Sequence, residues 1–278
     1  MIDYLRLFRV KHYIKNLFIF TTLIFGAELL TTNTIRVSIG FIAFCLISST
    51  IYIINDIVDY EIDKKTESKM NEPIPSGKIK KKNALILAFI LLILSLVVNY
   101  FTYSVSSYVY IIVYLLSNIF YSFIGKKIPY VELLIMSCFY LIRVYYGASI
   151  LNVSVSLVLT LTVIFGSLYI VIMKRITEVK IKKPRHVFTF YNENILKILS
   201  KISLVGMFIS YVWWLIIEKI VLLIPTLLIL LFIFIRYDKL ASNSNDCNPV
   251  NILLKDKVLV LLSVFYVLFV TIVIEIFL

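Results

Sequence analysis

The sequence predicts an all-α polytopic membrane protein in which nine transmembrane helices surround a central polar cavity. Of its 278 residues, 61% are hydrophobic and only 16% are charged. A soluble domain averages about 45–50% apolar and about 25% charged residues, so this composition excludes a water-soluble enzyme. It also excludes disorder, which requires low hydrophobicity. We expect residues 1–278 to form a single integral-membrane domain.

Apolar runs set the number of spans, because a helix needs about 20 mostly apolar residues to cross a bilayer. Residues 83–125 carry no charge and are long enough for two spans, with a turn in the polar cluster from Asn99 to Ser107. Only Glu218 and Lys219 separate the seventh span from the eighth. The predicted spans are residues 17–32, 37–55, two within 83–125, 128–150, 154–173, 202–217, 220–235 and 258–278.

The basic residues support this count and predict the orientation. With nine spans, the N-terminus and every second loop lie on one side of the membrane. All Lys and Arg fall on that side except Arg36 and Lys219, which fall on the other, and Arg143, which lies within the fifth span. Since basic loops stay in the cytoplasm, we expect that side to be cytoplasmic. The net charge of +12 therefore indicates orientation in a lipid membrane, and we expect no nucleic acid as a partner.

Acidic residues gather where the second span ends, in the segment 55–63, which reads NDIVDYEID. On an α-helix, Asp56, Asp59 and Asp63 fall within about 60° of one another, because each residue turns about 100°. Three carboxylates on one stripe at a membrane boundary repel one another and need a cation. Mg²⁺ suits them, since it binds to a few carboxylates and to substrate phosphates. We expect Asn55 and the three aspartates to be catalytic, and the aspartates to hold Mg²⁺.

A second interpretation of this segment is a solvated acidic face. Basic residues of the same loop, Lys64, Lys65 and Lys69, would then neutralise it. Because the acids begin at the last turn of an apolar helix, where ionisable residues are usually functional, the metal site is favoured.

The string NDxxDxxxD in this segment resembles the first aspartate-rich motif of the UbiA superfamily. The resemblance implies a nine-span membrane transferase that binds a diphosphate through Mg²⁺. The loop continues with residues 73–78, PIPSGK, which resemble the superfamily's RPxxxG segment, but Glu72 stands where an arginine is usual. This departure argues against a direct phosphate contact at position 72.

The loop after the sixth span is basic where most prenyl-transferring members of the superfamily carry a second aspartate-rich motif. It begins with residues 174–178, KRITE, and its only acidic residues are Glu178 and Glu193. Such a loop suits phosphate oxygens better than a second metal cluster. For its later lysines, a positive charge that only fixes the membrane orientation is the alternative.

The KRxxE string narrows the resemblance to a branch of the superfamily, the bacterial decaprenyl-phosphate phosphoribosyltransferases, which have a KRxxEL segment. Other matches follow in the same order along nearly the whole chain. They are Tyr13 with Lys15-Asn16 (QWxKN), Tyr121-Ser122 with Lys126 (YSxxLK), Leu141-Ile142-Arg143 with Gly147-Ala148 (LRxxAGA), Arg236-Tyr237 and Asp256-Lys257. Glu132 stands where that branch usually has an aspartate.

Arg143 lies inside the fifth span, where a buried arginine is costly and usually marks a polar cavity. Its side chain stays charged, so a phosphate or a carboxylate must be near. A structural pair with Glu132 is disfavoured, because eleven residues separate the two on one helix.

Besides the catalytic residues, we expect a set of substrate-binding residues that hold the phosphates of the donor and the acceptor. They are Lys15, Asn16, Tyr121, Lys126, Arg143, Lys174, Arg175, Glu178, Arg185 and Tyr191. Glu178 lies one helical turn from Lys174 and would orient its ammonium group.

We weigh three candidate functions against these residues. The first is Mg²⁺-dependent transfer of 5-phosphoribosyl from a sugar-phosphate donor, phosphoribosyl diphosphate, to a lipid-linked polyprenyl phosphate at the cytoplasmic membrane face. The second is a prenyltransferase that moves a prenyl group from prenyl diphosphate to an aromatic or quinone precursor; the missing second acidic motif disfavours it. A transporter or channel is disfavoured because acids and bases gather at one membrane face, and only Arg143 and Glu132 approach the midplane.

The predicted topology can be tested with single cysteines in a background that lacks native cysteine. Lys69→Cys and Lys183→Cys should react with a membrane-impermeant thiol reagent only from the cytoplasmic side, and Asn33→Cys only from outside. Reaction of all three from one side would refute the predicted arrangement.

Overall fold

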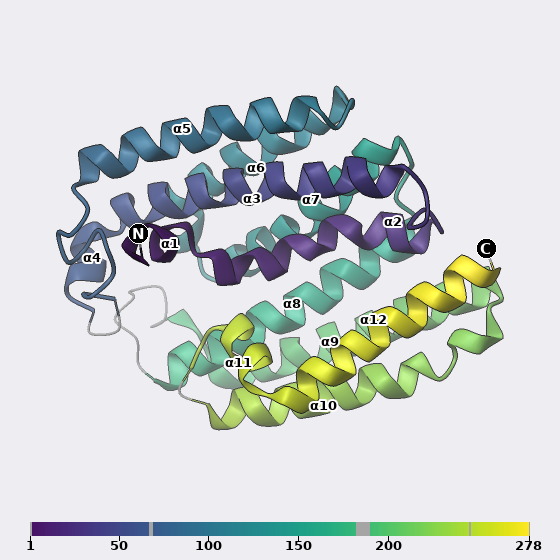
Figure 1. Cartoon of the computed structure of the whole chain (residues 1–278). Coiled ribbons are helices and arrows are strands. Elements are labelled where there is room, and N and C mark those ends of the chain that lie inside the picture. The colour runs from purple at the N-terminus through teal and green to yellow at the C-terminus, as the bar shows by residue number, and fades with distance from the viewer. Residues whose placement is uncertain (1, 67–68, 182–189, 245, 278) are drawn as a thin grey trace. The chain divides into compact units, whose positions relative to one another are not determined.

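The computed structural model describes residues 2–66, 69–181, 190–244 and 246–277, and every regular element in these ranges is helical. This confirms the predicted all-α class. The chain divides into two compact units, whose helices are labelled in Figure 1. Unit 1 consists of residues 1–21, 31–127 and 142–154, and unit 2 consists of residues 22–30, 128–141 and 155–278.

Eight helices in the described residues are long and apolar enough to cross a membrane. They are α3 (Asn33–Val58), α5 (Lys81–Tyr100), α6 (Ser106–Phe123), α7 (Val131–Leu151), α8 (Leu157–Lys180), α9 (Glu193–Glu218), α10 (Thr226–Asn243) and α12 (Lys257–Phe277). Each corresponds to a predicted span. The turn between α5 and α6 lies within residues 99–107, as the polar cluster predicts.

The first predicted span, residues 17–32, differs from a single transmembrane α-helix. It overlaps a 3₁₀ helix η1 (Val10–Phe20), which continues into the short α2 (Thr21–Phe25). Before η1 lies α1 (Ile2–Phe8), and Arg9 joins the two in a left-handed conformation with φ 52°. The apolar content of this segment predicts a helix, but it does not distinguish an α-helix from the tighter 3₁₀ form.

In unit 1, α3 packs against α5, α6 and η1, and Figure 1 shows α5 running along α3. Small polar side chains join α3 to α5. The Ser95 hydroxyl donates to the carbonyl of Ala43 at 2.8 Å, and the Thr50 hydroxyl donates to the carbonyl of Ala88 at 3.3 Å. Such side chains allow helices in a membrane to approach closely and supply hydrogen bonds between them. This packing fixes the end of α3, where the predicted catalytic residues lie.

Gly147 allows the C-terminal half of α7 to approach η1 within unit 1. A Cβ atom at Gly147 would lie 2.0 Å from the carbonyl oxygen of Ile19 and 3.0 Å from its carbonyl carbon. These are backbone atoms, so a larger residue requires one of the two helices to move. The same approach places Asn16 of η1 within 2.8 Å of Arg143.

In unit 2, α8 packs along α9, and α10 packs against α8, α12 and the short α11 (Pro249–Lys255). Buried residues from α8, α10, α11 and α12 form one apolar cluster around the C-terminal half of α8. They include Tyr169, Met173, Tyr237 and Leu259. This cluster holds the end of α8, which carries the KRITE segment.

We expect Gly147→Ala to destabilise unit 1, because the added methyl group must displace the backbone of Ile19. Overpacking of this kind costs about 1–3 kcal/mol, which thermal unfolding of the detergent-solubilised protein should show as a lower Tm. Gly166→Ala is the matched control, since its Cβ would lie 3.2 Å from the flexible end of Met207. Equal Tm values for the two variants would contradict the role of Gly147.

Candidate functional site

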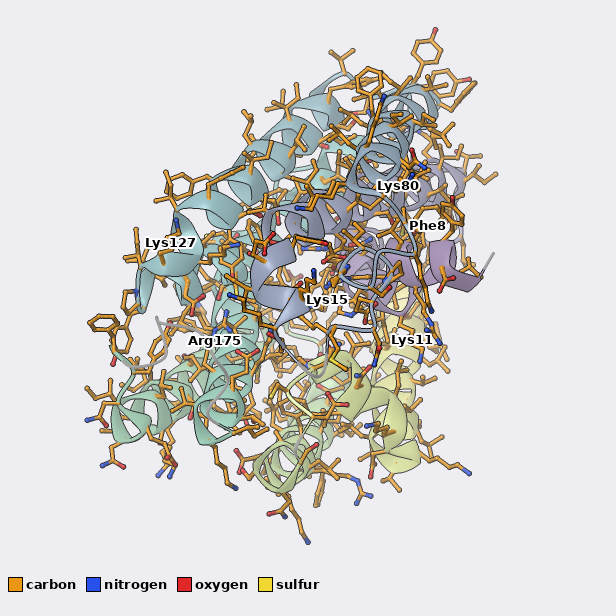
Figure 2. All side chains as sticks on the ribbon, turned by 90° about the vertical axis from the view of Figure 1, so that its left-hand side faces the viewer. Phe8, Lys11, Lys15, Lys80, Lys127 and Arg175 are labelled. Atoms are coloured by element: carbon orange, nitrogen blue, oxygen red, sulfur yellow. The ribbon has the colours of Figure 1, made fainter. Side chains whose placement is uncertain are left out.

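The three aspartates of the predicted metal site lie at one end of unit 1. Asp56 belongs to the last turn of α3, Asp59 follows that helix, and Asp63 lies in the short α4 (Tyr60–Lys64). Between 3% and 5% of the surface of each residue is exposed, so all three are shielded from water. Figure 2 looks onto this end; its labelled residues from unit 1 are Phe8, Lys11, Lys15, Lys80 and Lys127.

Each of these aspartates forms an ion pair with a basic residue from a different segment. The pairs are Arg9 with Asp56, Lys126 with Asp59, and Lys69 with Asp63. Nη2 of Arg9 lies 2.6 Å from Oδ1 of Asp56. Nζ of Lys69 lies 2.7 and 2.9 Å from the two carboxylate oxygens of Asp63. Each aspartate of the stripe is therefore neutralised by a basic residue of its own.

The structure combines features of the two interpretations of the acidic segment. Lys69 binds Asp63, as an acidic face neutralised by its own loop predicts. Lys64 and Lys65 are exposed, and Nζ of Lys64 lies 5.9 Å from the centre of the Tyr60 ring. The carboxylates themselves are buried, so the face is not a solvated one.

The aspartates suit Mg²⁺ by their chemistry, although they do not surround a common point. Among the residues that the structure describes, no three His, Cys, Asp or Glu side chains lie close enough to hold a metal ion. Mg²⁺ commonly binds one or two carboxylates and completes its six ligands with water and phosphate. Asp56 and Asp59 therefore fit it as protein ligands. Asn55 is adjacent, and its Oδ1 accepts a hydrogen bond from Ser122 at 3.2 Å.

Arg143 and Asn16 meet in the interior of unit 1. Nε of Arg143 donates to Oδ1 of Asn16 at 2.8 Å, and Nη2 donates to the hydroxyl of Tyr114 at 2.7 Å. The guanidinium carbon lies 5.5 Å from the centre of the Phe44 ring and 5.0 Å from that of Tyr114. These groups are neutral, and the ring faces stabilise the positive charge. Sequence reasoning missed both aromatic partners, because in an apolar helix they resemble ordinary core residues.

The other predicted residues of unit 1 occupy less buried positions. Lys15 on η1 and Tyr121 on α6 are half-buried. Tyr13, in the segment that resembles QWxKN, shares a hydrogen bond of 2.7 Å with Ser49 of α3. Arg185 lies outside the described residues.

The predicted residues of unit 2 form a buried ion-pair network. Arg175 of α8 binds the carboxylates of Glu132 and Glu178, with Nη2 2.9 Å from Oε2 of Glu132. The hydroxyl of Tyr191 donates to the other oxygen of Glu132 at 2.7 Å. Nζ of Lys174 lies 3.9 Å from Oε1 of Glu178. Two carboxylates and two cations balance one another in this network.

Tyr191 keeps its proton in this network. Burial, together with the negative charge of Glu132, raises the pKa of Tyr191. The hydroxyl therefore remains a hydrogen-bond donor to Glu132. A ring contact with Tyr130, at 5.1 Å between centres, further fixes its position.

The model of the UbiA prenyltransferase family matches residues 16–253. The chain belongs to this family. Over 184 residues it is 29% identical to decaprenyl-phosphate phosphoribosyltransferase of Mycolicibacterium smegmatis, a match that covers 64% of this chain and 58% of that protein. Over 177 residues it is 32% identical to digeranylgeranylglyceryl phosphate synthase of Methanococcus aeolicus, which covers 59% of this chain and 58% of that protein. The chain thus spans about three-fifths of the length of these relatives.

Solved structures share the fold of this UbiA-family protein. A UbiA homolog from Archaeoglobus fulgidus bound to GPP and Mg²⁺ aligns with a TM-score of 0.71 and 17% sequence identity, over 98% of this chain and 99% of that chain. Family membership and the eight helices of transmembrane length in the described residues establish a multi-pass membrane protein of the UbiA family.

The ion-pair network in unit 2 indicates a structural role for Arg175, which the sequence predicts to bind substrate. Its side chain has 0% exposed surface and is bound by two carboxylates, so it lacks an open face for a substrate phosphate. The sequence could not show this, because Glu132 is 43 residues away along the chain. Lys174, whose side chain is 26% exposed, is the accessible cation of the pair.

Replacing Arg175 should therefore affect folding before it affects substrate binding. Arg175→Met leaves Glu132 and Glu178 buried without their shared cation, and breaking a buried pair in this way costs about 3–5 kcal/mol. We expect a lower Tm and less monodisperse protein on gel filtration in detergent. Lys174→Met, at the neighbouring and more exposed position, should keep the wild-type Tm. A wild-type Tm for Arg175→Met would show that the network is not structural.

Proposed function

We propose that this UbiA-family protein transfers the 5-phosphoribosyl group of phosphoribosyl diphosphate to the phosphate of a lipid-linked polyprenyl phosphate, with Mg²⁺ as cofactor. The reaction takes place at the cytoplasmic face of the cell membrane in this proposal, because the basic loops are expected there. The observation that supports it is that Arg175, near the end of α8, binds the carboxylates of both Glu132 and Glu178.

Members of the superfamily that transfer prenyl groups mostly carry a second acidic motif where this chain has the KRITE segment. Here Arg175 binds both nearby glutamates, Glu132 and Glu178. Carboxylates bound to a fully buried arginine are poor ligands for a second metal ion, whereas Asp56 is paired with Arg9, whose side chain is 25% exposed. The same helix end offers Lys174 as an accessible cation. A phosphoribosyl donor carries a 5-phosphate besides its diphosphate and can use such a cation, whereas a prenyl donor has no second charged group.

The relative from M. smegmatis supports this reaction class, since it is named a decaprenyl-phosphate phosphoribosyltransferase. The KRxxE string is the segment that resembles this branch, so sequence similarity and local structure favour the same donor.

The residues of unit 1 are assigned to the metal and the leaving group. Asp56 and Asp59 hold Mg²⁺ in this proposal, and Asp63 assists them. When bound, Mg²⁺ supplies positive charge that stabilises a leaving diphosphate. Lys126 of unit 1 binds phosphate oxygens through charge-assisted hydrogen bonds. Lys174 is proposed separately as a phosphate ligand at the end of α8.

The transfer breaks the bond between C1 of the ribose and the diphosphate oxygen, and an oxygen of the acceptor phosphate forms the new bond to C1. The acceptor phosphate is ionised at neutral pH, so the chain need not supply a strong general base. Lys15 binds this phosphate in the proposal, and it lies on η1, which the hydrogen bond between Asn16 and Arg143 holds. Apolar surfaces of the helices suit the isoprenoid tail.

Prenyl transfer is the second candidate function. The relative from M. aeolicus is named digeranylgeranylglyceryl phosphate synthase and has the higher identity, 32%, over its matched stretch. The solved structure bound to GPP shares the fold, but a fold alone does not identify a substrate.

The two candidates can be separated with the purified protein in detergent and Mg²⁺. Label from phosphoribosyl diphosphate should enter a lipid fraction when polyprenyl phosphate is present, and label from prenyl diphosphate should not enter a quinone precursor. Asp56→Ala and Asp59→Ala should abolish the transfer without lowering expression, and Lys174→Met should lower it about tenfold or more, the value of one charge-assisted contact.

The exposed pair of Lys78 with Asp3, 3.7 Å apart, provides the matched control, because Lys78→Met changes a lysine outside the proposed site. Transfer of prenyl label alone would refute the phosphoribosyl proposal. Full activity of both aspartate variants would refute the metal assignment.

A further inference from the structure

The proposed metal site carries its own cations. Arg9 comes from the junction of α1 and η1, Lys69 from the loop after α4, and Lys126 from η2 (Gly125–Lys127). Each of them binds one aspartate of the stripe. Within these three pairs, the three carboxylates and the three basic groups have equal and opposite formal charges.

The cations are the more exposed partners in these pairs. The aspartate side chains are 4% to 7% exposed, whereas Arg9 is 25% exposed, Lys69 33% and Lys126 10%. Basic side chains therefore cover the carboxylates on the side toward water. Because lysine and arginine have long, flexible stems, they can turn away while the aspartates stay in place.

Arg9 shows this arrangement best. Its guanidinium carbon lies 5.3 Å from the centre of the Tyr52 ring, and Nη2 is bound to Asp56. Tyr52 and Asp56 are one turn apart on α3, so Arg9 lies along the last turn of that helix. The sequence separates Arg9 from Asp56 by 47 residues.

We propose that Arg9, Lys69 and Lys126 are built-in counter-cations of the aspartate stripe, so that a divalent metal ion and a diphosphate bind to it only together. This inference rests on the proposed function, because it takes the aspartates as metal ligands. It does not depend on the group that the diphosphate carries.

The reason is charge balance. A metal ion that binds alone must displace the basic groups, which then lie beside a further cation. A diphosphate that binds alone meets three buried carboxylates. When both arrive, the carboxylates turn to the metal and the basic groups turn to the phosphate oxygens, so every charge keeps a partner. Such linkage between two ligands is reciprocal.

Arg9→Gln tests this inference because it should change two affinities in opposite directions. It removes the cation that competes for Asp56, so Mn²⁺ alone should bind more tightly. It also removes a partner for phosphate, so pyrophosphate should bind more weakly at saturating Mn²⁺. We expect each change to be about tenfold, the value of one charge-assisted contact. Lys69→Gln, at the position that pairs with Asp63, should act in the same way.

The measurements use the full chain in detergent and do not depend on turnover. Electron paramagnetic resonance of free Mn²⁺ gives the metal affinity, and retention of radiolabelled pyrophosphate gives the diphosphate affinity. Lys78→Gln is the control with a matched change of charge, and Arg9→Lys should restore both affinities. Thermal unfolding confirms that each variant is folded.

Opposite shifts in Arg9→Gln and Lys69→Gln would support the inference. Shifts in the same direction, or none in either variant, would overturn it while leaving the metal and diphosphate site, and hence the proposed function, intact. If the wild-type chain binds neither Mn²⁺ nor pyrophosphate even when both are supplied together, both the inference and the metal-dependent function are refuted.

Discussion

The structure depends on one constraint, which is that a charge buried in a membrane protein must have a partner. Removing an ionised side chain from water is so costly that it persists only when an opposite charge or several polar groups surround it. In unit 1, the three aspartates meet this requirement with three separate cations. In unit 2, a single arginine joins two glutamates. The two clusters neutralise their buried charges in different ways, and this difference bears on which residues a ligand can reach.

The difference lies in how exposed the cation of each cluster is. In the aspartate cluster the carboxylates are the inner groups, and the cations that cover them are more exposed. Such cations can be exchanged without opening the fold. In unit 2 the arginine is fully buried, as is Glu132, and their ion pair joins α8 to α7. That cation cannot leave without unpairing two acids, so Arg175 supports the structure while Lys174 remains accessible to a ligand.

The sequence predicts what depends on local spacing. Apolar length predicts the long helices, and helical period places Asp56, Asp59 and Asp63 on one stripe. It does not predict partners that come from distant segments, such as Arg9 for Asp56 or Glu132 for Arg175. The position of a charged residue on a helix follows from the sequence, but the residue that neutralises it depends on how the helices pack. The first predicted span differs in the same way, because apolar length predicts a helix there but not the division into η1 and α2.

The fold by itself leaves the donor undecided, because the same arrangement of helices occurs in a homolog bound to GPP and Mg²⁺. A diphosphate leaving group is common to both candidate reactions, and the aspartate stripe suits either one. What distinguishes them is the charge at the end of α8. A site for a donor with one charged end needs a second set of acids only if it uses a second metal ion. A site for a donor with phosphates at both ends needs a fixed cation, and our proposal assigns this role to Lys174, whose Nζ lies 3.9 Å from Oε1 of Glu178.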